Sequence, residues 1–113
     1  MKIKRPQHSS LASGRWREFT LMEQLANIGS EVSRALNWRG KNEEYSRMAS
    51  NRALELLDLS IDDPKNSKRL GELFRIREFL ADYFYFDNEY KSSEKLWRQY
   101  FDAFAYNVAI NRR

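Results

Sequence analysis

Apolar residues recur at three- and four-residue spacing along most of the chain, and this pattern predicts helices rather than strands. The first helix is expected to follow Thr20 and to end near Trp38–Gly40. Thr20 and Glu23 have the spacing of a capping box, in which each side chain accepts a hydrogen bond from a free amide at the helix start. The apolar face of this helix comprises Leu21, Leu25, Ile28, Val32, Ala35 and Leu36.

A second helix is expected after Asn42, a residue that commonly caps helices, with Glu43 and Glu44 favourably placed near the positive end of the helix dipole. Its apolar face comprises Tyr45, Met48, Ala49, Ala53, Leu56, Leu57 and Ile61. The segment Asp63–Asn66 predicts a turn, because the residue before a proline disfavours helix.

A third helix over residues 67–86 has two apolar stripes. The first comprises Leu70, Leu73, Phe74, Leu80, Ala81 and Phe84, and the second comprises Ile76, Phe79, Tyr83 and Phe86. Such a wide apolar arc predicts either a central position in a bundle or burial against a second subunit.

A polar loop over residues 87–91 separates this helix from a fourth, which Ser92 or Ser93 would cap. Its inward positions are expected to be Leu96, Trp97, Tyr100, Phe101, Phe104, Ala105 and Val108. Because the connections are short, successive helices should be antiparallel. The sequence therefore predicts an all-α, up-down antiparallel four-helix bundle over residues 18–113, with a disordered basic arm over residues 1–17.

Positive charge is concentrated at the two ends of the chain. Of 20 Lys and Arg residues, seven lie outside residues 18–111, and that interior carries 13 cations against 16 acids. The seven terminal cations are Lys2, Lys4, Arg5, Arg15, Arg17, Arg112 and Arg113. We expect them to contact the phosphates of a nucleic acid, with little sequence preference and strong dependence on salt.

Two tryptophans lie next to arginines in the sequence and could add ring contacts to the predicted binding of nucleic acid. Trp16 lies between Arg15 and Arg17, and Trp38 precedes Arg39. Trp16 could stack on a base, or it could dock the arm onto the bundle.

Two further arginines fall where core residues belong. Arg52 and Arg77 are flanked by apolar residues at helical spacing, and a buried guanidinium must find a carboxylate. We predict a buried charge network in which they reach Glu31, Glu55 or Glu78, inside the bundle or at a subunit seam. The alternative is that both arginines extend to the surface along their methylene stems.

Other sequence features exclude several classes of site and of function. The chain has no cysteine, which excludes disulfides and thiolate metal sites, and no apolar run of membrane-spanning length. Its N-terminus lacks the apolar stretch of a secretory signal, so a cytoplasmic location is expected. No Ser–His pairing, glycine-rich phosphate loop or dinucleotide motif is present.

The candidate catalytic residues are few. The single histidine, His8, lies in the arm, so neither a Glu-x-x-His di-iron pair nor the Arg–His pair of HEPN-type RNases occurs in the helices. Glu55 and Asp58 share one helical face, which leaves open a nucleotide or RNA hydrolase that uses a carboxylate-bound metal together with Arg52 and Arg77. We predict a non-enzymatic protein without a cofactor or metal.

Four segments look like those of an uncharacterised family of small prokaryotic helical proteins: Gln24–Glu31, Arg52–Leu59, Asp63–Pro64 and Arg77–Glu78. That similarity covers most of residues 16–110 and implies no assigned activity. In size, helical layout and its basic end Asn111–Arg113, the chain more remotely resembles the accessory-variability (Avd) proteins of diversity-generating retroelements and their relatives in ribosomal intervening sequences. This resemblance implies a ring-shaped homo-oligomer that binds nucleic acid and partners a reverse transcriptase.

The first hypothesis is therefore a non-enzymatic accessory protein that self-associates through its third and fourth helices and binds nucleic acid through its basic termini. The hydrolase is one alternative. The other is a protein-interaction module, such as an antitoxin-like partner, whose arm folds on a protein surface.

Overall fold

The computed structural model describes residues 14–111, which are helical without a strand. The main helices are α2 (Leu21–Trp38), α3 (Glu43–Ile61), α4 (Leu70–Tyr85) and α5 (Glu94–Asn111). A 3-10 helix, η1 (Pro64–Arg69), connects α3 to α4. The expected all-α class is confirmed. No helix within residues 14–111 has both the length and the apolar character needed to span a membrane.

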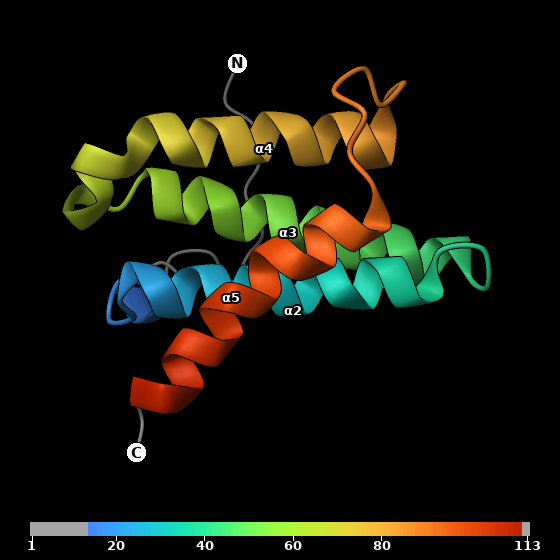
Figure 1. The fold of residues 1–113 in the computed structure, drawn as a ribbon. Helices are drawn as coiled ribbons and strands as arrows, with labels where there is room; N and C mark the ends of the chain where they lie inside the picture. The colour runs from blue at the N-terminus through green and yellow to red at the C-terminus, as the bar shows by residue number, and fades with distance from the viewer. Residues whose placement is uncertain (1–13, 112–113) are drawn as a thin grey trace.

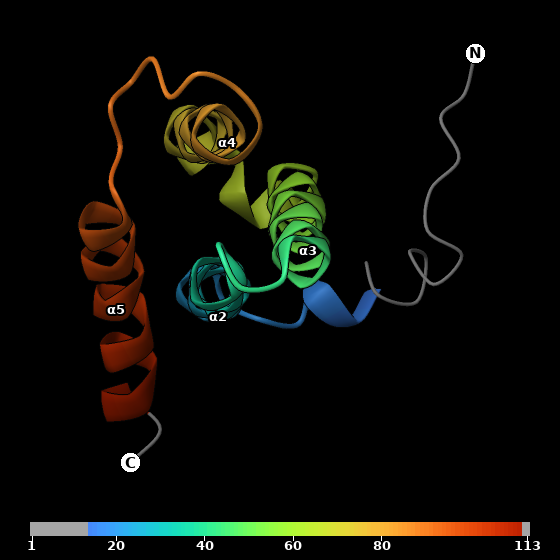
Figure 2. The same cartoon turned by 90° about the vertical axis from the view of Figure 1, so that its right-hand side faces the viewer.

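The helices α2, α3 and α4 run antiparallel in chain order, α2 against α3 and α3 against α4 (Figure 1). Helix α5 departs from the expected up-down arrangement. It packs across α2 at a steep inclination instead of running alongside α4, and it is seen from the side in the view where the other three are seen end-on (Figure 2). A closed four-helix bundle is therefore not confirmed.

The helix boundaries follow local signals in the sequence. The capping box at the start of α2 is confirmed: Glu23 N donates to Thr20 Oγ1 at 3.1 Å, and Thr20 N donates to Glu23 Oε1 at 2.9 Å. Asn42 caps α3, since its Oδ1 accepts from Tyr45 N at 3.1 Å. Gly40, in the turn between them, has a φ of +83°, which favours glycine.

The segment after Asp63, for which a turn was predicted, forms the 3-10 helix η1. Asp63 caps η1 by accepting from Lys65 N at 3.1 Å, and Pro64 occupies the first position, where its missing N–H costs nothing. As a result α4 begins at Leu70, three residues later than the sequence pattern predicts.

The core lies where α2 meets the other helices. The side chains with at most 1% exposure include Leu25, Ile28, Val32, Leu57, Leu73 and Leu80. Several positions on the predicted apolar faces are exposed in the single chain: Tyr45, Met48, Phe74, Phe86, Leu96 and Ala105. On α5 the reason is its oblique course, because only the side with Trp97 and Phe101 reaches α2 closely enough to be buried. For Phe74 and Phe86, burial against a second subunit remains the open alternative.

Gly29 sets the position of α5 on α2. A Cβ at residue 29 would lie 2.6 Å from Cβ of Phe101 and 2.9 Å from its Cγ. These are atoms at the base of the ring, which cannot move without moving α5. The absence of a side chain at residue 29 is therefore what allows Phe101 to pack directly on α2.

We predict that Gly29→Ala destabilises the protein by about 1–3 kcal/mol, because overpacking outweighs the better helix propensity of alanine. Gly71→Ala in α4 is the matched control. A Cβ there meets nothing within 4 Å, so the variant should be as stable as the wild type or more so. Urea unfolding of both variants measures the difference, and equal stability of the two would contradict the tight contact.

Candidate nucleic-acid interface

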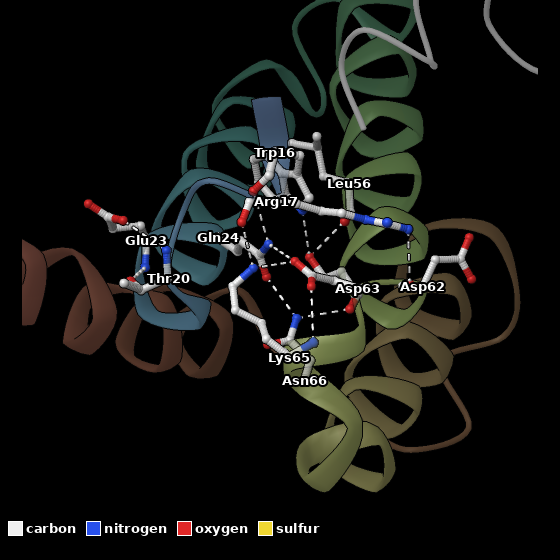
Figure 3. A network of polar contacts seen from close by, with 11 residues as sticks. Trp16, Arg17, Thr20, Glu23, Gln24, Leu56, Asp62, Asp63, Lys65 and Asn66 are labelled. Atoms are coloured by element: carbon white, nitrogen blue, oxygen red, sulfur yellow. Dashed lines mark hydrogen bonds and ion pairs between the residues drawn. The ribbon is translucent and has the colours of Figure 1, made fainter. Parts of the chain in front are cut away.

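The residues just before α2 are attached to the helical body. Trp16 is only 6% exposed, and its indole N–H donates to Ser60 Oγ at 3.0 Å (Figure 3). Its carbonyl accepts from Gln24 Nε2 at 3.1 Å. Of the two roles predicted for Trp16, the structure places it in the docking role, and its buried ring is not available to stack on a base.

A cluster of polar side chains lies beneath Trp16: Gln24, Ser60, Asp63 and Asn66 are buried, and the exposed Lys65 joins them through Asp63. We call these five residues the anchor cluster. Gln24 Nε2 donates to Asp63 Oδ2 at 2.9 Å, and Asn66 Nδ2 donates to Gln24 Oε1 at 2.8 Å. Lys65 pairs with Asp63 and donates to the carbonyl of Arg17 at 2.9 Å. The cluster thus ties the start of α2, the end of α3 and the preceding segment together (Figure 3).

The charge of Asp63 depends on these partners. Burial alone raises the pKa of its carboxyl group, but the hydrogen bonds from Lys65 and Gln24 and the Lys65 charge outweigh burial, so the pKa lies below its ordinary value of 3.8. Asp63 is therefore ionised at neutral pH. Its stabilising contribution is complete above about pH 4 and is lost as the pH falls through the folded-state pKa.

We predict that Asp63→Asn lowers the free energy of unfolding at pH 7 by about 1–3 kcal/mol, because the amide has one oxygen where the carboxylate has two and carries no charge to pair with Lys65. The difference from the wild type should shrink as the pH falls below the ordinary pKa. Urea unfolding at a series of pH values measures it. Asp102→Asn, which changes an exposed acid on α5, should have little effect at any pH, and a pH-independent loss in Asp63→Asn would contradict the ionised state.

The predicted cations are only partly within the described chain. Arg15 and Arg17 are exposed, and Arg17 donates to the carbonyl of Asp62 at 3.3 Å. Lys2, Lys4, Arg5, Arg112 and Arg113 lie outside the described residues. The segment before α2 and the end of α5 lie on different sides of α2 (Figure 2). The described parts of the two ends are therefore not brought together within one chain.

The predicted buried charge network does not form. Arg77 pairs with Asp58 instead, through Nε–Oδ1 at 2.6 Å and Nη2–Oδ2 at 3.2 Å, and both side chains are partly exposed. The hydrogen bonds that Arg77 donates to Asp58 raise the pKa of Arg77 above its ordinary value. Arg77 therefore pairs with an acid of α3, as the choice of Glu55 would have required, but that acid is Asp58, three residues after Glu55.

The other members of the predicted network lie apart. Glu31 pairs with Arg34 at 3.0 Å, and the exposed Glu78 accepts from the Tyr90 hydroxyl at 2.8 Å. Arg52 is exposed, as the alternative prediction had it. Glu55 is only partly buried.

The geometry gives the hydrolase alternative no support. Both carboxylate oxygens of Asp58 are held by Arg77. Within residues 14–111, no group of three or more His, Asp or Glu side chains is placed to hold a metal ion.

Arg52 instead lines a groove between the second half of α2 and the first half of α3. The groove has a volume of about 330 Å³, and we call it the arginine–aromatic groove. Trp38 and Tyr45 lie in it edge to face, with ring centroids 5.1 Å apart. Their exposed fractions are 38% and 49%, so both side chains are partly open to solvent. The further lining residues are Glu31, Arg34, Met48, Ala49 and Arg52.

Cations exceed acids around this groove, whereas the rest of the body is acidic. Residues 31–52 carry five cations and three acids, and residues 53–111 carry eight cations and eleven acids. Arg52 has no ion-pair partner in the described part of the chain. Arg39 and Arg47 lie at the same end, over the rings of Tyr83 at 4.5 Å and Tyr85 at 5.2 Å.

The sequence does contain residues that indicate this groove, but they were predicted to lie in the core. Tyr45 and Met48 fit the apolar stripe of the second helix, so both were expected in the core. The useful signal was their proximity to Arg52 one turn later, together with Trp38 at the end of the preceding antiparallel helix.

No family model, curated protein or solved structure matches the chain. The resemblances to the uncharacterised prokaryotic family and to Avd proteins therefore stay predictions.

Proposed function

We propose that this protein is a non-enzymatic accessory protein that binds single-stranded nucleic acid and self-associates. The observation that carries the proposal is the arginine–aromatic groove. It combines two partly exposed aromatic side chains, Trp38 and Tyr45, with Arg52, which has no ion-pair partner within residues 14–111. These residues lie in the part of the body where positive charge is in excess.

This combination suits single strands better than duplexes. Aromatic side chains stack on bases that are already unstacked, and nearby arginines neutralise the adjoining phosphates. The anchor cluster supports the same function, because it fixes Arg15 and Arg17 at the opposite end of the α2–α3 pair from the groove. The basic residues 1–13 continue from this anchored point and would add further phosphate contacts.

Self-association is proposed because the second half of α5 presents apolar side chains to solvent. Tyr106 is 70% exposed and Ile110 is 42% exposed, while Phe74 on α4 is 54% exposed. Assembly through α4 and α5 would cover these side chains and collect cationic ends that lie apart in one chain. The resemblance to Avd proteins adds a ring-shaped assembly and a reverse transcriptase partner to the proposal. We propose a cytoplasmic location as well, on the sequence features described above.

We predict that Trp38→Ala weakens binding of a fluorescein-labelled, mixed-sequence single strand by about 1–3 kcal/mol, because one stacking platform is lost. Fluorescence anisotropy with RNA and with DNA at about 50 and about 200 mM salt measures the affinity and its salt dependence. Arg52→Gln should weaken binding and lower the salt slope by about one.

Two variants serve as controls. Phe86→Ala removes an exposed ring from the acidic connection after α4, and Lys95→Gln removes an exposed cation from α5; neither should change the affinity as the groove variants do. Binding that is insensitive to salt, or equal in Trp38→Ala and Phe86→Ala, would contradict the proposed interface.

We also predict that the wild-type chain has a solution mass above that of one subunit, and that Tyr106→Glu lowers this mass by placing charge in the assembly surface. Light scattering coupled to gel filtration measures both. Lys95→Glu, a charge change at the exposed first turn of α5, should leave the mass unchanged. A wild-type mass equal to one subunit would contradict self-association.

A further inference from the structure

A second cavity lies between α4, the connection over residues 86–93, and the first half of α5. Its volume is about 760 Å³, within the range typical of small-molecule sites. It exists because α5 packs across α2 and leaves the neighbouring side of α4 uncovered (Figures 1 and 2). Its apolar wall is formed by Ile76, Phe79, Leu96, Trp97 and Tyr100.

The connection that borders the cavity is held in place by specific contacts. The buried Asp82 accepts from the backbone amides of Glu89 at 2.9 Å and Tyr90 at 3.0 Å. The ring of Tyr90 stacks on Phe79 with centroids 4.2 Å apart. This border of the cavity is therefore fixed by contacts within the chain.

The charged groups of the lining leave positive charge in excess. Glu72 is neutralised, because Arg69 donates to its Oε1 and the Tyr100 hydroxyl donates to its Oε2 at 3.2 Å. Arg75 and Lys91 are exposed cations of the lining, and neither has an ion-pair partner among residues 14–111.

Trp97 adds an unsatisfied donor beside the cavity. The residue is 6% exposed, and its indole N–H is the buried side-chain polar atom that lacks a hydrogen-bond partner within the described chain. Buried donors of this kind are rare in folded proteins because an unmade hydrogen bond costs stability. Because this N–H is closed to solvent, an occupant of the cavity would contact the indole ring and would leave the N–H unpaired.

We propose that this cavity binds a small amphipathic anion, whose apolar chain or ring covers Ile76, Phe79 and Trp97 and whose carboxylate faces Arg75 and Lys91. A purely apolar occupant would leave the two cations without a partner, and a purely polar anion would leave the aromatic wall exposed. The site is separate from the arginine–aromatic groove, which is lined by α2 and α3.

The test compares decanoate with decan-1-ol, which has the same chain without the charge, by isothermal titration calorimetry on the full chain. Decanoate is expected to bind at least about tenfold more tightly, a difference that a charged head contact can supply. In the double variant Arg75→Gln/Lys91→Gln this preference should disappear while decan-1-ol binding is retained. Lys95→Gln, a cation of α5 outside the lining, should preserve the preference.

A second variant tests the apolar wall without risking the fold. Leu96 is 56% exposed, so Leu96→Glu should fold normally by circular dichroism and yet lose binding of both probes. Equal binding of the two probes, or an unchanged preference in the double variant, would overturn the proposal. It would also be overturned if neither probe binds the wild type and Leu96→Glu lowers the solution mass, because a second copy would then be the occupant.

Discussion

The contact between Phe101 and Gly29 constrains most of the structure beyond α4. Because residue 29 has no side chain, Phe101 lies directly against the α2 backbone and α5 crosses α2 at that point. A helix fixed in this way cannot also run alongside α4. The cavity between α4 and α5 and the solvent-facing second half of α5 are both consequences of this one crossing.

The anchor cluster has the complementary role at the other side of α2. Gln24, Asp63 and Asn66 are at most 3% exposed, and their polar atoms satisfy one another and the backbone of the segment before α2. Buried polar groups are tolerated only when they are paired in this way, so the cluster requires Trp16 and Lys65 to stay in place. The cluster therefore fixes the place on the helical body where Trp16 and Arg17 are attached.

The features of the fold that depend on residues close together in the sequence were predicted correctly. The all-α class, the Thr20 capping box and the Asn42 cap were predicted correctly, since each rests on side chains within one helical turn. The course of α5 could not be predicted, because the apolar periodicity of residues 96–108 shows which positions are apolar but not which helix they contact. Gly29 carried the missing information, but a glycine inside a helical pattern indicates a close contact only once the partner is known.

The candidate sites show the same limit. Helical spacing identified Arg77 as a residue in need of a partner, yet that partner, Asp58, was assigned to a possible metal site. The anchor cluster was missed because Gln24 is 39 and 42 residues from its partners Asp63 and Asn66, and each member has an ordinary local explanation. Gln24 follows the capping box, and Asp63 precedes a proline.

The position of Trp16 defines where the chain can be shortened. A protease cut or a fusion junction ahead of Gly14 leaves the indole over Ser60 and the amide of Gln24 covered. A cut only four residues later removes that cover and exposes the ionised Asp63 and its neighbours to water. Two truncated proteins of nearly equal length would therefore differ in whether the junction of α2, α3 and η1 stays closed.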